Sequence, residues 1–255
     1  MSDVTNHYRL NMPLRSEKEV NSVLKLADVL HESSLSDVEK AMHFPLYSPR
    51  QAIASFLLKY EMFKHILNVH GSIIECGVAY GSGLMSFATF SAIFEPVNHT
   101  RKVIGFDTFE GFPSLSEQDK AGQDPNAKVG GMNVDSYNEI LKCINVFDQN
   151  RFVGHINKVE LVKGDLTKTA PEYLKNNPHL VVALLYLDLD LYEPTKVAIQ
   201  TFLPRMPKGA IIAFDELNHP DWPGETVAVL EDIGIRNLRI ERFPFDSVRC
   251  FAVIE

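Results

Sequence analysis

The sequence feature that most constrains the fold is the stretch from Ser72 to Gly83, which reads SIIECGVAYGSG. A short apolar run ends at Glu75, glycines follow at positions 77, 81 and 83, and a helical pattern begins at Leu84. Glycine permits positive φ angles and lets a ligand approach the backbone closely, and we expect Ser82 to cap the following helix. A strand, a glycine turn and a helix in this order predict a nucleotide-sized crevice at the carboxyl end of the first strand of an open α/β sheet.

Apolar strands and helical patterns alternate after Gly71. We expect strands at 72–76, 102–106, 159–163, 181–187 and 209–214, and helices at 82–94, 136–147, 168–176, 194–204 and 223–233. Continuous apolar strands separated by helices predict a mostly parallel sheet that is covered on both faces. Two last strands, at 238–242 and 249–254, are close enough in sequence to pair as an antiparallel hairpin. We therefore expect a Rossmann-like α/β fold with seven strands, the arrangement of class I methyltransferases.

The first 70 residues predict a helical appendage ahead of the sheet. Helical patterns cover 16–31, 35–42 and 49–69, and the first begins at a Ser cap. Residues 1–70 either cover one face of the sheet or form a lid or an oligomerisation segment, and we expect residues 71–255 to form the catalytic domain. The connection 113–135 is polar and has no period. Since a connection of this length is usually functional or disordered, we expect a mobile flap over the site.

Composition excludes several classes of protein. The chain has 255 residues and a net charge of −8, which argues against nucleic-acid binding because phosphate binding needs a basic surface. No apolar run approaches the roughly 20 residues of a membrane span, and the polar start shows no signal peptide. Three distant cysteines indicate reduced thiols and no disulfide or zinc framework. We expect a cytoplasmic protein without nucleic-acid or membrane partners.

An acid follows each of the five expected parallel strands. These acids are Glu75, Asp107, Asp165, Asp188 and Asp215. Because the carboxyl ends of parallel strands open on one edge, where ligands bind, we expect the five side chains to line one site. Asp107 ends the second strand, where an acid can accept hydrogen bonds from ribose hydroxyls. Asp165 is then placed to meet an adenine amino group, with the backbone amide of Leu166 beside it.

A second acidic group lies in LYLDLDLYEPT and FDELNHPDW. Nine acids and three basic residues occur between positions 181 and 232, so nearby bases are not expected to neutralise the acids. Converging carboxylates repel one another unless a cation lies among them or a proton is taken up. Oxygen ligands suit Mg²⁺, which predicts a metal at this edge. His219 lies just beyond and is either a base, a substrate contact or an ordinary surface histidine.

The segments IECGVAYGSG, GFDTFEGFP, YLDLDLYEPT and FDEL, in this order and spacing, resemble the macrocin-type (TylF/MycF) sugar O-methyltransferases. The resemblance covers about residues 47–232. It implies a class I enzyme that uses S-adenosylmethionine and a divalent metal, Mg²⁺ or Mn²⁺, to methylate a sugar hydroxyl on an antibiotic or a nucleotide-linked sugar. It also implies a homo-oligomer.

The resemblance assigns roles by position. Glu75 and the glycine turn would hold the methionine part of the cofactor, Asp107 the ribose and Asp165 the adenine. Asp190 is the candidate base, with Asp188 and His219 as further catalytic candidates. Glu216 stands where the family commonly has Asp, which makes the third metal contact the least typical. The cofactor-binding candidates are Glu75, Gly77, Tyr80, Ser82, Asp107, Thr108, Phe109, Asp165 and Leu166, and the metal candidates are Asp188, Asp215 and Glu216.

Other functions remain open at this point. A glycosyltransferase can hold a Mg²⁺–nucleotide-sugar with a D-x-D pair, and Asp188 and Asp190 form such a pair. An NAD-dependent dehydrogenase is less consistent with the glycine spacing, which differs from G-x-G-x-x-G. A non-enzymatic cation-binding module would consume no cofactor. Within the methyltransferase interpretation, a catechol-like acceptor is an alternative to a sugar, because both are vicinal diols.

Overall fold

Three helices precede the sheet, as the sequence predicts. The computed structural model describes residues 16–120, 122 and 124–255, which form two compact units that divide between Leu57 and Leu58. The first unit contains α1 (Glu17–Glu32), α2 (Asp37–Met42), the short η2 (Phe44–Leu46) and the start of α3 (Arg50–Ile66). Both α1 and α2 begin with a capping box, in which a serine and a glutamate three residues later satisfy each other's backbone amides.

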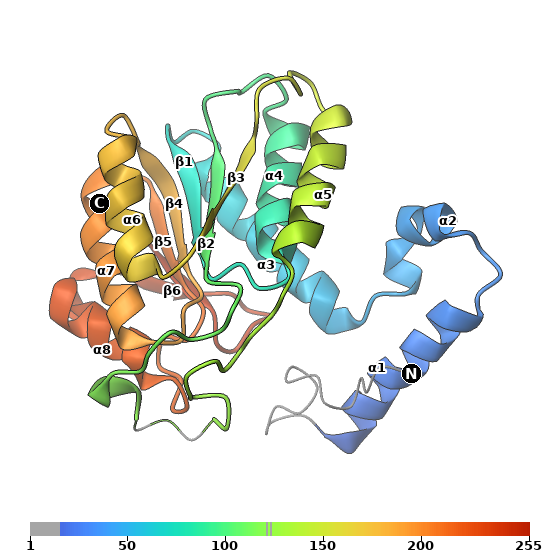
Figure 1. Cartoon of the computed structure of the whole chain (residues 1–255), viewed down its shortest axis with the longest axis horizontal. Helices are drawn as coiled ribbons and strands as arrows, with labels where there is room; N and C mark the ends of the chain where they lie inside the picture. Colours follow the sequence, from blue (N-terminus) through green and yellow to red (C-terminus); the bar gives the residue numbers. More distant parts are fainter. Residues whose placement is uncertain (1–15, 121, 123) are drawn as a thin grey trace. The chain divides into compact units, whose positions relative to one another are not determined.

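The second unit is built on a seven-stranded sheet in the order β3-β2-β1-β4-β5-β7-β6 (Figure 1). Strands β1 to β5 are parallel, and β7 is antiparallel to both β5 and β6. This confirms the predicted parallel sheet with its C-terminal hairpin. The strands are β1 (Ser72–Cys76), β2 (Val103–Asp107), β3 (Val159–Lys163), β4 (Val182–Leu187), β5 (Ile211–Phe214), β6 (Ile240–Arg242) and β7 (Cys250–Val253).

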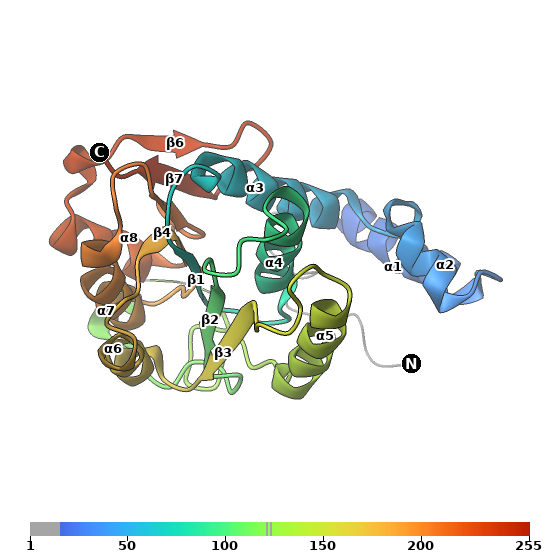
Figure 2. The same cartoon turned by 90° about the horizontal axis from the view of Figure 1, so that it is seen from above.

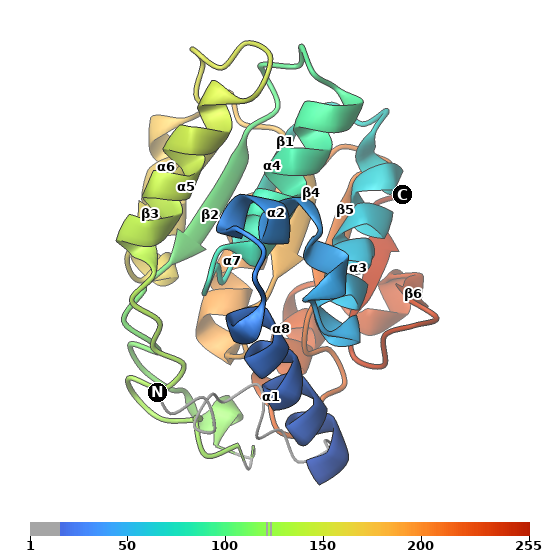
Figure 3. The same ribbon diagram turned by 90° about the vertical axis from the view of Figure 1, so that its right-hand side faces the viewer.

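Helices cover both faces of this sheet (Figures 2 and 3). On one face lie α4 (Ser82–Phe94) and α5 (Tyr137–Gln149), and on the other lie α6 (Leu166–Asn176), α7 (Tyr192–Phe202) and α8 (Pro223–Asp232). Every residue of the central strands β1 and β4 is therefore buried, which explains their continuous apolar sequences. Short turns η3 (Glu117–Asp119), η4 (Leu203–Arg205) and η5 (Ile235–Asn237) complete the unit.

No helix within residues 16–120, 122 and 124–255 is both long enough and apolar enough to cross a bilayer.

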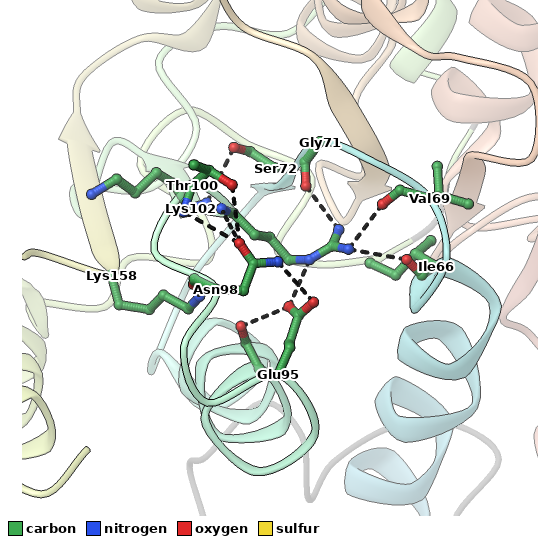
Figure 4. Close-up of polar contacts among 11 residues, drawn as sticks. Ile66, Val69, Gly71, Ser72, Glu95, Asn98, Thr100, Lys102 and Lys158 are labelled. Carbon is green, nitrogen blue, oxygen red and sulfur yellow. Dashed lines mark hydrogen bonds and ion pairs between the residues drawn. The ribbon is translucent and has the colours of Figure 1, made fainter. Parts of the chain in front are cut away.

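A buried arginine joins the elements at the amino end of the sheet (Figure 4). Arg101 is 3% exposed, and its guanidinium donates to the carbonyl oxygens of Ile66, Val69 and Gly71. Its Nε lies 2.6 Å from Oε1 of Glu95 at the end of α4. The guanidinium thus satisfies the carbonyl of Ile66, the last residue of α3, and connects the end of α3, the start of β1 and the end of α4.

Replacing Arg101 with methionine is expected to destabilise the protein by about 3–5 kcal/mol, because it removes the cationic partner of the largely buried Glu95 carboxylate and leaves three carbonyl oxygens without their donor. The free energy of unfolding in urea measures this. The matched control is Arg239→Met, since Arg239 forms an ion pair with Glu241 in which both side chains are largely exposed. Such a pair contributes less than about 1 kcal/mol, and equal losses in the two variants would contradict the role assigned to Arg101.

Candidate active site

The glycine turn after β1 is packed directly against the end of β4. Gly77 has a φ of +92°, and a Cβ atom there would lie 1.7 Å from the carbonyl oxygen of Asp188. The amide of Asp188 in turn donates to the carbonyl of Cys76 at 2.8 Å. Gly77 is therefore required both by its backbone angle and by the approach of the neighbouring strand end.

The helix that follows the turn is capped differently from our expectation. Gly81, with a φ of +79°, occupies the N-cap of α4, and Ser82 is the first helical residue. No side chain caps this end, so the prediction that Ser82 caps the helix is wrong. The reason is that the left-handed turn places glycine at the cap position, and the first amides of α4 receive no side-chain oxygen.

Asp107, at the end of β2, holds the glycine turn in place. Its Oδ2 accepts from the amides of Val78 (2.7 Å) and Ala79 (2.8 Å), and its Oδ1 accepts from the amide of Phe109 (2.7 Å). A carboxylate has about four acceptor positions, and three are used here. Asp107 therefore orders two loops of the crevice and keeps one acceptor position for a ligand.

The remaining candidates beside Asp107 have distinct surroundings. Thr108 donates through Oγ1 to the carbonyl of Gly111 (2.7 Å), which closes a tight turn. Phe109 is buried against the ring of Tyr137, with centroids 5.2 Å apart. Tyr80 is half-exposed at the turn. These residues thus surround the turn with both polar and aromatic groups.

Asp165 and Leu166 begin α6. The Asp165 side chain caps the helix by accepting from the Thr167 amide (3.0 Å) and hydroxyl (2.7 Å), and it pairs with Lys168 at 3.0 Å. Although burial favours the neutral acid, the hydrogen bonds from Thr167 and Lys168 lower the pKa of Asp165. Leu166 is buried in the core, so only its backbone is placed to meet a ligand.

Four of the predicted acids gather at the ends of β4 and β5. Asp188 and Asp190 follow β4, and Asp215 and Glu216 follow β5, which pairs with β4. The amide of Asp215 donates to the carbonyl of Leu187 at 2.9 Å, which keeps the two strand ends together. The sheet therefore brings together the acids that the sequence places 25 or more residues apart.

A fifth acid, Glu225 on α8, joins this group and was not among the predicted site residues. It is fully buried, and its Oε1 accepts from the Glu216 amide at 3.1 Å. Burial, followed by repulsion from Asp215, Asp190 and Asp188, raises the pKa of Glu216 to about 10. Burial and Asp215 also raise the pKa of Glu225. Oε2 of both glutamates is buried without a hydrogen-bond partner.

Positive charge at the site comes from outside the acidic stretch. Arg249 Nε lies 2.5 Å from Asp215 Oδ1, its Nη2 is 3.5 Å from Oδ2, and the Tyr186 hydroxyl also donates to Oδ1. Burial raises the pKa of Asp215, but Arg249 and Tyr186 outweigh it and lower the pKa. The expectation that no base neutralises these acids was therefore wrong for Asp215, because the base lies beyond position 232 in sequence.

Lys59 of α3 is a second cation at the site, is 5% exposed, and lies beside Glu75. A Cβ atom at Gly83 would be 1.8 Å from Glu75 Oε1 and 2.9 Å from Lys59 Cε, so both side chains meet under the start of α4. Burial lowers the pKa of Lys59 and raises that of Glu75. The sequence did contain a signal for Lys59, since it shares a helical face with buried Met62, Phe63 and Ile66.

His219 uses one ring nitrogen within its own loop. Its Nδ1 accepts from the Asp221 amide at 3.2 Å, and Nδ1 lies 3.8 Å from Glu216 Oε2. An imidazole that accepts through Nδ1 carries its proton on Nε2 when neutral. The structure therefore places His219 beside the acidic group, with no free acceptor nitrogen in this arrangement.

The acidic group has some of the features that a divalent cation requires. The donors are oxygens, Glu216 Oε2 is buried without a partner, and Asp215 Oδ2 has only the 3.5 Å contact to Arg249. These features fit a hard cation in donor chemistry. Within the described ranges, however, no group of three or more His, Cys, Asp or Glu side chains is arranged to hold an ion.

The family model and the similar solved structures that match this chain are all O-methyltransferases or methyltransferases. The sequence model of the macrocin O-methyltransferase (TylF) family matches residues 61–229. A crystal structure of CalS11, a calicheamicin methyltransferase, is 35% identical with a TM-score of 0.89, over 94% of this chain and 93% of that chain. An apo structure of CalS11, the TDP-rhamnose 3'-O-methyltransferase of calicheamicin biosynthesis, is 32% identical with a TM-score of 0.82, over 94% and 95% of the two chains.

A more distant structure shares the fold. The O-methyltransferase NovP is 20% identical with a TM-score of 0.57, over 78% of this chain and 79% of that chain. No curated protein matches the chain significantly in sequence.

Proposed function

Because this chain belongs to the macrocin O-methyltransferase (TylF) family, we propose that it transfers a methyl group from S-adenosylmethionine to a sugar hydroxyl. The acceptor is a natural-product glycoside or a nucleotide-linked deoxysugar. Membership of the family makes the chain an S-adenosylmethionine-dependent O-methyltransferase. The observation that carries the proposed mechanism is the direct contact between the glycine turn and the acidic group, at Gly77 and Asp188.

We assign the cofactor to the crevice above the glycine turn. When bound, S-adenosylmethionine supplies an electrophilic methyl group that leaves its sulfur for the acceptor oxygen in an in-line displacement. The turn offers backbone amides at the start of α4, where no side chain fills the cap position. Asp107 has one acceptor position for a ribose hydroxyl, and the loop at Asp165–Leu166 is assigned to the adenine.

Asp190 is the proposed base. An alcohol is nearly as weak an acid as water, whose pKa is about 15.7, so the acceptor hydroxyl needs a group that takes its proton as the new O–C bond forms. Asp190 lies half-buried three residues after the end of β4, near enough to Glu216 for its charge to raise the pKa of that residue. It is preferred to His219, whose Nδ1 already accepts a hydrogen bond.

Asp188, Asp215 and Glu216 are the proposed metal ligands, with Mg²⁺ as the cation. When bound, a divalent cation would lower the pKa of a coordinated hydroxyl and fix its oxygen. Support comes from the buried Glu216 Oε2 without a partner and from the like charges that raise the pKa of Glu216. Binding would require the three carboxylates to turn toward a common point, with Arg249 and Tyr186 keeping Asp215 Oδ1.

Replacing Asp188 with asparagine is expected to weaken Mn²⁺ binding at least about tenfold, because an amide lacks the charge of the carboxylate that it replaces. Titration followed by electron paramagnetic resonance, without cofactor or acceptor, measures this. Glu193→Gln is the control, since Glu193 is an exposed acid in the same sequence motif. Full methyl transfer in excess chelator, or equal Mn²⁺ binding in both variants, would rule out this metal site.

A screen of acceptors tests the function as a whole. The enzyme is incubated with methyl-labelled S-adenosylmethionine and a panel of nucleotide-linked deoxysugars, glycosides and catechols, with and without Mg²⁺. Labelled sugar product supports the proposal, whereas transfer to catechols alone would replace the acceptor class. Calorimetry with S-adenosylhomocysteine and with nucleotide sugars separates this function from glycosyl transfer. Tight binding of the nucleotide sugar without binding of S-adenosylhomocysteine would overturn it.

We also propose that the chain forms a homo-oligomer through residues 1–70. Helices α1 and α2 contain no buried residue, yet they carry exposed apolar side chains such as Val29, Val38 and Met42. Apolar surface of this kind favours association. A monomer in analytical ultracentrifugation would contradict this proposal.

A further inference from the structure

The turn that presents Asp190 has a strained backbone. Asp190 has a φ of +61°, and the amide of Leu191 donates to the carbonyl of Leu189 at 2.6 Å. This is a three-residue γ-turn with positive φ at its centre, a rare and strained conformation for a residue other than glycine. Such a conformation persists only where the surrounding structure holds it. The neighbouring contacts therefore decide where the Asp190 carboxylate lies.

A carboxylate from another part of the chain holds the end of this turn. Helix α7 begins right after the turn, and its N-cap residue, Leu191, offers no side-chain hydrogen bond. Instead, the first helical amide, that of Tyr192, donates to Asp119 Oδ1 at 2.8 Å, although the two residues are 73 positions apart. Asp119 thus caps α7 from the connection between β2 and α5, which runs along the carboxyl edge of the sheet (Figure 1).

The surroundings of Asp119 are built for this contact. Asp119 is 4% exposed, and its Oδ2 accepts from the amide (2.8 Å) and the hydroxyl (2.6 Å) of Ser116. A Cβ atom at Gly224, in the first turn of α8, would lie 2.1 Å from Asp119 Oδ1 and 2.5 Å from the Tyr192 amide. Only glycine at position 224 leaves room for the pair. A carboxylate is also favourable at a helix N-terminus.

The same connection has a second anchor on the neighbouring loop. The ring of Phe112 packs against Trp222, with centroids 5.7 Å apart, and Trp222 precedes α8. A Cβ atom at Gly122 would lie 2.0 Å from the carbonyl oxygen of Asp221. The connection that was expected to be a mobile flap is therefore tied to the segments that follow β4 and β5.

We infer that Asp119 is a positioning residue for methyl transfer: it fixes the first amide of α7 and thereby the strained turn that aims Asp190 at the acceptor. This inference rests on the proposed role of Asp190 as the base. In this proposal Asp119 acts through the Leu191–Tyr192 backbone, to which its Oδ1 is bonded at the Tyr192 amide. Its loss should therefore change the rate of the chemical step without changing cofactor binding.

Three variants test this inference. Asp119→Ala removes the contact to Tyr192, Asp119→Asn keeps an acceptor oxygen for it, and Ser116→Ala removes only the Ser116 hydroxyl. With the acceptor found in the screen, kcat of Asp119→Ala should fall about 10–100-fold, since small misplacements of reacting groups have effects of this size. Its Kd for S-adenosylhomocysteine should stay within about threefold, because the hydrogen bonds of Asp119 go to Ser116 and to Tyr192 at the start of α7, on the side of the proposed base. Asp119→Asn should recover part of kcat, because its single acceptor oxygen can serve the Tyr192 amide only while its NH2 group faces the Ser116 amide. Ser116→Ala keeps the hydrogen bond from the Ser116 amide to Asp119, so it should resemble the wild type.

Hydrogen exchange at Tyr192 gives a readout that is independent of activity. The amide of Tyr192 should exchange faster in Asp119→Ala than in Ser116→Ala, because it has lost its acceptor. If Tyr192 exchange and kcat are unchanged in a folded Asp119→Ala, the inference is overturned. Should Asp119→Ala fail to fold, Asp119→Asn takes its place, and an Asp119→Asn with wild-type kcat but accelerated exchange at Tyr192 also overturns it.

A double variant separates this inference from the proposed function. If Asp119 acts through Asp190, adding Asp119→Ala to Asp190→Asn should lower kcat by less than about threefold more, since coupled residues are not additive. Full additivity would overturn the inference while leaving Asp190 as the base. If Asp190→Asn alone retains full activity, the proposed base is wrong. Faster exchange at Tyr192 in Asp119→Ala would then show that Asp119 only caps α7 and has no role in positioning a base.

Discussion

Replacing Asp190 with asparagine is expected to lower kcat for methyl transfer by about 10²–10⁴-fold, the usual contribution of a general base. The amide keeps the shape of the carboxylate but cannot take the proton of the acceptor hydroxyl. Asn tolerates the positive φ of position 190, so the turn should keep its conformation. Steady-state kinetics with labelled S-adenosylmethionine measure kcat, and calorimetry with S-adenosylhomocysteine should show unchanged cofactor binding.

The matched control for this prediction is His219→Gln. His219 lies beside Glu216 and was the rival candidate for the base, yet its Nδ1 accepts from the Asp221 amide. We expect its loss to change kcat by less than about tenfold, because a neutral imidazole with Nδ1 engaged has no acceptor for the proton. A large loss in His219→Gln together with an active Asp190→Asn would reverse the two assignments.

Replacing Arg249 with methionine is expected to destabilise the protein by about 3–5 kcal/mol at pH 7, because it strands the buried charge of Asp215. Arg249 Nε lies 2.5 Å from Asp215 Oδ1, and Asp215 is 6% exposed. Unfolding in urea measures the loss. The double variant Arg249→Met with Asp215→Asn removes the stranded charge, so it should be more stable than Arg249→Met alone. A double variant that is less stable than the single one would contradict this account.

The pH dependence of the same ion pair has a definite sign. Burial opposes ionisation of Asp215, but Arg249 and Tyr186 lower its pKa below the ordinary value. The folded state therefore binds this proton less readily than the unfolded state, so the stabilisation is fully present above the ordinary aspartate pKa of about 3.9. It is lost as the pH falls through the lowered pKa. The stability difference between wild type and Arg249→Met should shrink in acid, and a difference that grows there would refute the pairing.

The order of elements could be predicted from sequence because its signals are local. The apolar runs at 72–76 and 159–163 match β1 and β3 residue for residue, and the helical pattern at 82–94 matches α4. Elsewhere the observed helix boundaries differ from the predicted ones by a few residues, because a capping residue sets the start of the helix. Helix α6 begins at Leu166, two residues before the predicted start at 168, because the Asp165 side chain accepts the Thr167 amide. In α4 the N-cap position is occupied by Gly81, and not by the predicted Ser82.

The candidate site could be predicted from sequence only in its acids. Each acid follows its own apolar strand, and the rule that parallel strands end on one edge then brings them together. Arg249 and Glu225 gave no comparable signal, since their part in the site depends on the antiparallel position of β7 beside β5 and on the way α8 packs. Asp119 reads in sequence as one polar residue of a long connection.

The strands, the helices and the edge of the sheet at which the carboxylates collect follow from local sequence, because hydrophobic periodicity and strand direction are properties of neighbouring residues. Which cation pairs with Asp215 depends on the three-dimensional fold. Arg249 reaches Asp215 from 34 positions away, and Asp119 reaches Tyr192 from 73. A buried charge needs an opposite charge or a hydrogen-bond partner next to it in space, and the residue that supplies this partner cannot be identified from the neighbouring sequence.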